Sequence, residues 1–314
     1  MVGASAAMWL TVNQDNWRDT SGAFAGLPWL SLATLLVLAV VAVTHYVCAG
    51  IALRDVASAA LPLRQVTLAQ LAAAATNRLV PSGMGGAGIN LRYLTRAGVP
   101  AGAATSAVAG LAVVGGLTDA LYVAGISGIG PSLGFGGARA ELSALARSSL
   151  SSGRSHGWLV AAIVGVGLVV VLVRLRGRLV AALIGAMRQA AGHVLSLVRR
   201  PGQMARAATA SMATTAVLSI GFVLAVHTWG SSSAPLPAGG LIALYWVAIA
   251  AGNAVPLPPV FGVTEAALIT GLVLSGYSAT SATTCVVVFR IVTYWLALPA
   301  GVWAGRRLRR AALL

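Results

Sequence analysis

Charged residues are scarce in this sequence, and lysine is absent. Only 9% of the 314 residues are charged, whereas a soluble domain carries about 25%. All 21 basic residues are arginine, and six acidic residues leave a formal net charge of +15. Because 58% of the residues are hydrophobic, the composition excludes an ordinary soluble domain. It predicts an all-α fold, a polytopic membrane helix bundle.

The sequence also lacks the residue clusters on which catalysis and metal binding depend. Its two cysteines and four histidines are scattered without metal-ligand spacing, and no Ser-His-Asp order indicates a hydrolase. The glycines of GMGGAG (83–88) follow a membrane helix rather than a strand, which excludes a nucleotide-binding loop. His45 and His227 lie in apolar spans and are interpreted as buried, hydrogen-bonded residues. We therefore expect no cofactor, no metal and no enzymatic activity of this chain alone.

Long apolar segments recur along the chain. Five of them approach or reach the ~20 residues that a bilayer-spanning helix requires. Two more are interrupted in the middle by proline and glycine clusters. The predicted full spans are 29–51, 101–126, 157–173, 207–229 and 281–304, and the interrupted stretches are 67–98 and 238–276.

The positions of the arginines predict the topology. They lie in loops between spans rather than on one soluble face, so positive-inside topology explains the net charge and no nucleic-acid partner is expected. The loop 174–206 and the basic tail 306–314 should both be cytoplasmic. An even number of crossings must separate them, so 238–276 contributes either none, as a re-entrant hairpin, or two. Residues 1–28 are then extracytoplasmic, and 29–305 form one transmembrane domain.

The segment 178–199 has a different pattern. Its apolar residues follow helical i, i+3, i+4, i+7 spacing, and its arginines lie largely off that stripe. This predicts an amphipathic helix on the anionic cytoplasmic leaflet, ended by Pro201 and Gly202. The alternative is a tight helical hairpin packed onto neighbouring spans.

The two interrupted stretches resemble each other. NRLVPSGMGGAG from Asn77 and NAVPLPPVFGVTE from Asn253 have matching breaks, and each is followed by a full span. In the predicted topology the first unit (about 67–126) enters from the cytoplasm and the second (about 240–304) from outside, which is the arrangement of an inverted repeat. The break motifs contain Pro81, Ser82, Gly83, Gly85 and Gly86 in the first unit, and Pro256, Pro258, Pro259, Gly262 and Thr264 in the second.

These breaks predict a binding site at membrane depth. Irregular backbone is tolerated there only where protein or a water-filled cavity surrounds it. Helices that restart after Gly85–Gly86 and after Gly262 would direct unpaired N–H groups and positive dipole ends into that cavity. Two such ends facing each other would hold an anion.

The same residues carry a family resemblance. NRLVPSGMGGAGINLRYLTRAGVP, and the later series Pro-x-x-x-Gly-x-x-Glu, Arg-x-x-x-Tyr-Trp and Pro-x-Gly, resemble the lysylphosphatidylglycerol synthase transmembrane (flippase-like) family over about residues 30–305. The resemblance implies a multi-pass protein of the bacterial inner membrane that moves or engages phospholipids or lipid-linked sugars by their head groups. The soluble aminoacyl-transferase domain of true synthases does not follow, so we do not expect lipid aminoacylation by this chain alone.

The sequence departs from the family pattern in its charges. Many members have an acidic residue directly after the Gly-Gly pair, where this chain has Ala87, and an arginine three residues further on, where it has Asn90. An arginine is also common shortly before the acidic residue of the next span, whereas Gly115 and Gly116 precede Asp119 here.

Glu265 and Arg290 are the leading candidates for the site. Glu265 follows the second break and either complements the helix dipole or provides a proton, cation or head-group amine site. Arg290 lies within a span and either pairs with Glu265 or clamps a lipid phosphate, for which the planar guanidinium is suited. Both roles are compatible if Arg290 switches from Glu265 to phosphate.

The remaining candidates lie near the breaks. Asp119 either pairs with Arg78 or Arg92 or gates the cavity, and those two arginines either contact phosphate or lie at the cytoplasmic interface. Asn77 and Asn253 precede the breaks and are expected to satisfy freed backbone groups. The predicted head-group and cavity residues are Glu265, Arg290, Asp119, Arg78, Arg92, Asn77, Asn253, Asn90 and Tyr294.

Three functions are compatible with these observations. The leading hypothesis is a lipid translocase that holds an anionic phospholipid or polyprenyl-linked lipid at a midplane cavity between the breaks. The second is a membrane-embedded enzyme acting on lipid head groups, which would need a nucleophile or metal cluster. The third is a non-transporting partner of a cell-envelope synthase.

Overall fold

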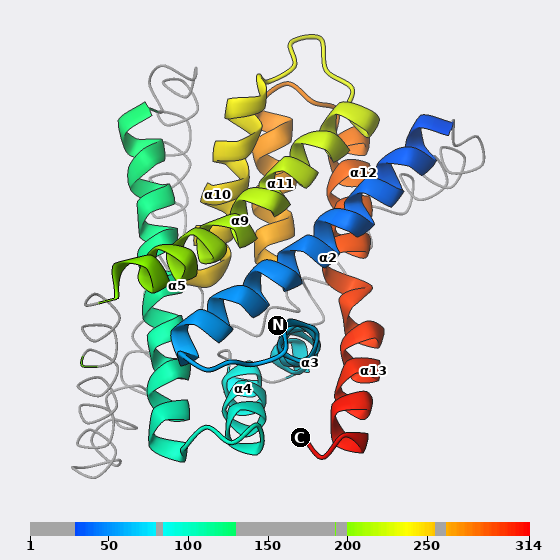
Figure 1. Cartoon of the computed structure of the whole chain (residues 1–314). Helices are drawn as coiled ribbons and strands as arrows, with labels where there is room; N and C mark the ends of the chain where they lie inside the picture. The colour runs from blue at the N-terminus through cyan, green and yellow to red at the C-terminus, as the bar shows by residue number, and fades with distance from the viewer. Residues whose placement is uncertain (1–28, 80–83, 130–191, 193–199, 255–261) are drawn as a thin grey trace, which may run out of the picture.

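The computed structural model describes residues 29–79, 84–129, 192, 200–254 and 262–314 (Figure 1). Within these residues the regular elements are helices, which confirms the all-α membrane bundle. Four of the described helices are long and apolar enough to cross a bilayer: Ser31–Ala57, Ala101–Tyr122, Pro201–Trp229 and Ala279–Arg310. The predictions for 1–28, for 157–173 and, except at Gly192, for 178–199 lie outside the described residues.

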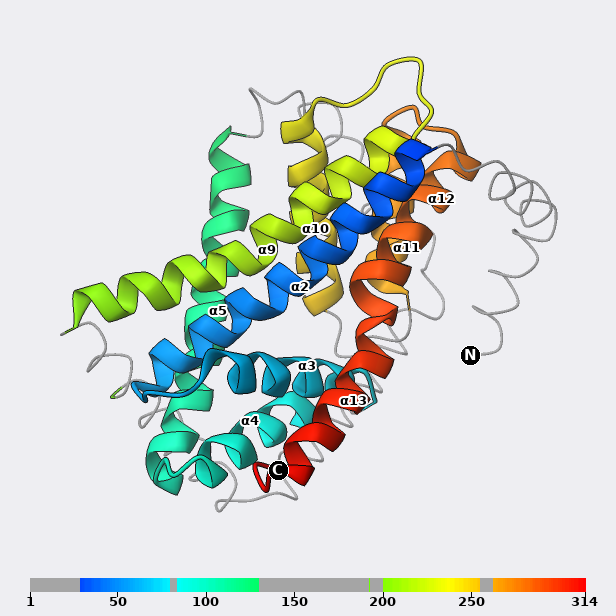
Figure 2. The ribbon, with the colours of Figure 1, turned by 45° about the vertical axis from the view of Figure 1, so that its right-hand side comes forward.

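The four described spans are longer helices than the sequence predicted. α9 begins at Pro201 rather than near 207 because proline at the first helical position has no N–H to leave unpaired. α2 and α9 lie side by side, diagonally across the molecule (Figures 1 and 2). The helices are α2 (Trp29–Ala57), α5 (Ala101–Ile129), α9 (Pro201–Trp229), and a final span of α12 (Ala279–Arg290), the π-helix η4 (Ile291–Trp295) and α13 (Ala297–Arg310).

The first interrupted stretch forms a helical hairpin. It consists of α3 (Leu63–Leu79) and α4 (Met84–Arg96), which pack against each other. The prediction that the helix restarts after Gly85–Gly86 is wrong, because α4 begins at Met84 and contains both glycines. Pro81, Ser82 and Gly83 lie outside the described residues.

The two glycines allow close packing of this hairpin rather than ending a helix. A Cβ atom at Gly85 would lie 2.8 Å from the carbonyl oxygen of Thr76, and one at Gly86 would lie 2.5 Å from the side chain of Asn77. Neither position has room for a side chain, so glycine brings the first turn of α4 directly against the last turns of α3.

Replacing Gly85 with alanine is therefore expected to destabilise the hairpin. The added methyl group would meet backbone of Thr76, which cannot rotate away, and overpacking of this kind costs about 1–3 kcal/mol. Gly88→Ala in the same helix is the control, because a Cβ there meets nothing within 4 Å. Thermal unfolding in detergent should show a lower midpoint for Gly85→Ala and an equal or higher one for Gly88→Ala. Equal midpoints for the two variants would contradict the packing described here.

The second interrupted stretch forms a corresponding hairpin of α10 (Ala238–Ala254) and α11 (Val263–Leu274). The restart predicted after Gly262 is confirmed, since Gly262 adopts φ 71°, a left-handed conformation that suits glycine, and α11 begins at the next residue. A Cβ at Gly252 would collide with the hydroxyl oxygen of Thr264, so glycine also allows close packing between the two helices of this hairpin. Pro256, Pro258 and Pro259 lie outside the described residues.

The two hairpins lie in different parts of the molecule. In Figure 1 the α10–α11 hairpin opens toward the top, whereas α3 is seen nearly end-on with α4 below it, and Figure 2 shows α3 and α4 lying across the lower part of the molecule. α5 and the α12–α13 span, which follow the hairpins, run in opposite directions in the same view. This is the arrangement expected of two units with opposite topology. Their relation as an inverted repeat stays a prediction.

Candidate functional site

An ion pair joins the start of α11 to the end of α12. The Nε atom of Arg290 lies 2.6 Å from Oε1 of Glu265, and the two side chains are only 11% and 24% exposed. Phe289, next to Arg290, packs edge-to-face on the rings of Phe222 in α9 and Tyr245 in α10, which fixes this part of α12. The pairing that the sequence offered as one role for these two residues is present.

Tyr294 brings the first hairpin to the same place. The guanidinium carbons of Arg78, in the last turn of α3, and of Arg290 each lie 4.0 Å from the centroid of the Tyr294 ring. Each contact is a cation–π interaction worth about 0.5–2 kcal/mol. The last turn of α3, in the first hairpin, and the end of α12, which Arg290 pairs with the start of α11, therefore meet around one tyrosine.

The π-helix η4 positions this tyrosine. The N–H of Leu296 donates to the carbonyl oxygen of Ile291, five residues earlier, at 2.9 Å. Such a wide turn inserts a residue into the helix, rotates the side chains that follow it, and is frequent at functional sites. Nothing in the periodicity of the apolar segment 281–304 indicated it.

Replacing Tyr294 with leucine is expected to lower stability, because both guanidinium groups lose the ring. The cost should be about 1–3 kcal/mol for two cation–π contacts. Tyr294→Phe is the matched control: it keeps the ring, and the Tyr294 hydroxyl has no hydrogen-bond partner among the described residues. Chemical or thermal unfolding in detergent should show that the Tyr294→Leu variant is less stable than the Tyr294→Phe variant. A phenylalanine variant as unstable as the leucine variant would show that the hydroxyl, not the ring, is important.

Arg78 is a buried cation with incomplete pairing. It is 7% exposed, and its Nη2 atom donates to the hydroxyl oxygen of Tyr46 in α2 at 3.3 Å. Its Nε atom has no hydrogen-bond partner, and no carboxylate pairs with it, in the part of the chain that the structure describes. Two guanidinium groups thus contact the Tyr294 ring, and one carboxylate is paired with Arg290, which makes this region positive and suited to an anion.

Asn77 occupies one N–H at the start of α4. Its Oδ1 atom accepts a short hydrogen bond from the backbone N–H of Gly86, in the first turn of that helix. This is the backbone-satisfying role predicted for Asn77. It also corrects the expectation that the N–H groups of this helix start are free for an anion, since Gly86 is already bonded. The side chain of Asn253 lies outside the described residues.

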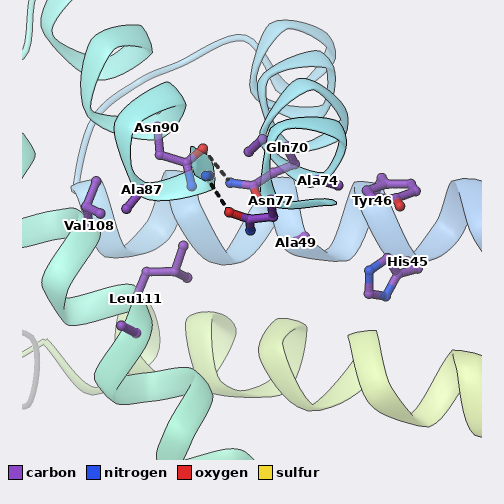
Figure 3. A pocket seen from close by; sticks show the side chains of 13 residues that line it. His45, Tyr46, Ala49, Gln70, Ala74, Asn77, Ala87, Asn90, Val108 and Leu111 are labelled. Carbon is purple, nitrogen blue, oxygen red and sulfur yellow. Dashed lines mark hydrogen bonds between the residues drawn. The ribbon is translucent and has the colours of Figure 1, made fainter. Parts of the chain in front are cut away.

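A cavity of about 350 Å³ lies beside Arg78, between α2, α3, α4 and α5 (Figure 3). Its polar lining is uncharged, and within it the Gln70 Nε2 atom donates to the Asn90 Oδ1 atom at 3.3 Å. Ala87 and Asn90, the two positions that replace charged residues of the family pattern, both line it. Tyr46 connects the cavity to Arg78. The polar side chains of the lining are those of His45, Tyr46, Gln70, Asn77 and Asn90.

Two predicted charged residues do not join the site. Asp119 is exposed on α5 and Arg92 is exposed on α4, and neither forms an ion pair within the described residues. The predicted pairing of Asp119 with Arg78 or Arg92 is therefore wrong. A charge in an apolar segment shows that the position is unusual, but it does not show which face of the helix carries it.

Of the two histidines that were predicted to be buried and hydrogen-bonded, neither is fully buried. His45 Nδ1 is hydrogen-bonded to the carbonyl oxygen of Thr214 at 3.0 Å, as predicted, although the residue is only partly buried. His227 is exposed, so its predicted burial is wrong, and its ring nitrogen is hydrogen-bonded to the carbonyl oxygen of Val223 one turn earlier. The described residues contain no group of three or more His, Cys, Asp or Glu that could hold a metal ion.

Comparison with known families supports a membrane lipid role. The sequence model described as the lysylphosphatidylglycerol synthase TM region matches residues 1–301. No curated protein sequence matched the chain. The matched region includes both hairpins and every residue around Tyr294. This multi-pass membrane protein therefore belongs to the family of the lysylphosphatidylglycerol synthase transmembrane region.

Proposed function

We propose that this protein is a lipid translocase of the bacterial inner membrane that holds the phosphate of an anionic lipid between its two hairpins. The observation that carries the proposal is Arg78, a buried guanidinium without a carboxylate partner among the described residues. Burying an uncompensated charge is costly, so such a group indicates a missing counter-ion. A phosphate fits because guanidinium binds it through two parallel hydrogen bonds.

Arg290 provides the second contact to that phosphate. It shares the Tyr294 ring with Arg78 and is held by Glu265 through a single Nε–Oε1 contact. When lipid phosphate arrives, Arg290 exchanges Glu265 for phosphate oxygens. Glu265 then becomes an unpaired carboxylate at membrane depth, which takes up a proton or binds a cationic group. This exchange couples occupancy of the site to the position of α11 and so gives a route to alternating exposure.

The arginine-rich C-terminal tail and the paired hairpins support this proposal. If the two units have opposed topology, each can open the site toward one leaflet, as in transporters built from opposed repeats. We place the C-terminus in the cytoplasm and assign the chain a binding and transport role rather than an enzymatic one. The lipid tails would remain in the bilayer while the head group crosses.

A second function is favoured by one observation. The Arg290–Glu265 pair is closed, as it would be in a non-transporting partner of a cell-envelope lipid synthase. A fluorescent anionic lipid in reconstituted vesicles separates the two functions. Membrane-impermeant dithionite quenches only the outer leaflet, so transport appears as quenching beyond the outer half of the label. We expect this extra quenching with the protein and none in protein-free vesicles. Lipid binding without extra quenching would favour the partner role.

A further inference from the structure

We infer that the cavity beside Arg78 selects the head group of the lipid, and that it takes an uncharged, hydroxyl-bearing group such as glycerol, inositol or a sugar. This inference rests on the proposed function, because it assumes that a lipid phosphate occupies the neighbouring arginine site. It concerns a different set of residues, so the two can fail independently.

The cavity and the arginine site are adjacent and share Tyr46. Tyr46 lines the cavity, and its hydroxyl accepts the hydrogen bond from Arg78. Asn77, the neighbour of Arg78 in the chain, lines the cavity on the α3 side. A lipid with its phosphate at Arg78 would therefore place the group beyond the phosphate within reach of this space. Its volume of about 350 Å³ is within the range of small-ligand sites and exceeds what a phosphate alone requires.

The lining has the hydrogen-bonding character that hydroxyl groups need. A hydroxyl both donates and accepts, and a carboxamide offers two N–H donors and a carbonyl acceptor. The Gln70–Asn90 bond uses one donor of Gln70 and the carbonyl of Asn90. Within the part of the chain that the structure describes, the Gln70 carbonyl and the Asn90 N–H groups are left for a ligand. Because Asn90 is only 7% exposed, its N–H groups have little access to bulk water, and a hydrogen bond from a ligand would stabilise them.

The same lining disfavours an amine. None of the described residues that line the cavity is a carboxylate, and Tyr46, one of them, is hydrogen-bonded to the guanidinium of Arg78. A head group that ends in an ammonium would meet no counter-ion and would be repelled by Arg78. Aminoacylated and ethanolamine lipids should therefore bind more weakly than a polyol lipid with the same acyl chains.

Native mass spectrometry of the full chain with lipids of matched acyl chains tests this selectivity. The set is phosphatidylglycerol, phosphatidylinositol, phosphatidic acid, phosphatidylethanolamine and lysylphosphatidylglycerol. We expect the first two to bind about tenfold more tightly than phosphatidic acid, since two additional hydrogen bonds are worth about that factor, and the last two to bind least. A lipid-linked sugar of the same tails would extend the comparison. Equal binding of phosphatidylglycerol and phosphatidic acid would overturn the inference.

Two variants keep the test independent of the arginine site. Gln70→Leu combined with Asn90→Leu should remove the tenfold preference for phosphatidylglycerol over phosphatidic acid. Asn90→Asp keeps the side-chain shape but adds a carboxylate, so it should weaken the binding of phosphatidylglycerol and strengthen that of lysylphosphatidylglycerol. If neither variant changes the lipid preference, the cavity is not the selective site. Binding of all anionic lipids should be lost in Arg78→Gln, and that result tests the proposed phosphate site rather than the selectivity of the cavity.

Discussion

The Arg78→Gln variant is expected to lose lipid binding and translocation almost completely. Hydrogen bonds to charged groups contribute about 1.5–3 kcal/mol each, so losing a two-bond contact to phosphate should lower affinity at least a hundredfold. The fold should tolerate the change, because the removed charge has no carboxylate partner within the described residues. The lost contacts to Tyr46 and Tyr294 are offset by the removal of a buried cation. Vesicle quenching assays and lipid titration measure the two effects.

Two other variants make this result specific. Arg92→Gln removes an exposed arginine of the same hairpin that forms no ion pair with described residues, and it should retain wild-type transport. Arg78→Lys keeps the charge but loses the planar fork, so it should retain only part of the affinity. Equal losses of lipid binding and transport in Arg78→Gln and Arg92→Gln would show that the effect comes from net charge rather than from a specific phosphate site. Full activity of Arg78→Gln would refute the phosphate site.

The charged residues of the site were easier to predict than the residues that connect them. Arg78, Glu265 and Arg290 are conspicuous because ionisable groups in apolar segments are costly and rare. Tyr46 was missed because a tyrosine in an apolar helix is an ordinary packing residue, and its contact with Arg78 joins positions 32 residues apart. Gln70 was missed because its hydrogen bond to Asn90 also joins residues far apart in the sequence, 20 positions in this case. Such pairings depend on how helices cross, which one sequence does not specify.

Local backbone form shows a similar limit. The breaks between α3 and α4 and between α10 and α11 follow directly from clustered proline and glycine. Glycine alone is ambiguous, since Gly262 supplies a left-handed turn whereas Gly85 and Gly86 lie inside a helix and permit close packing. The sequence pattern did not predict the π-helix η4. This π-helix nevertheless sets where Tyr294 points, and with it the geometry of both arginines.

The Arg290–Glu265 pair yields the second large effect, through a double-mutant cycle. Arg290→Gln alone leaves a mostly buried carboxylate without its partner, which should cost about 3 kcal/mol of stability. Glu265→Gln alone should cost less, because Arg290 keeps its contact with the Tyr294 ring. The double variant removes both charges, so it should recover most of the loss, with a coupling of about 1–3 kcal/mol in detergent unfolding.

Transport by the double variant then decides what the pair does. If Arg290 leaves Glu265 to bind phosphate, the double variant is stable but inactive, since the second phosphate contact is gone. If the pair only holds α11 against α12, restoring stability restores transport as well. Stable protein that binds anionic lipid weakly and fails to move it across vesicles is the expected result. A double variant that transports at the wild-type rate would leave Arg78 as the sole anion-binding arginine and exclude the exchange at Glu265.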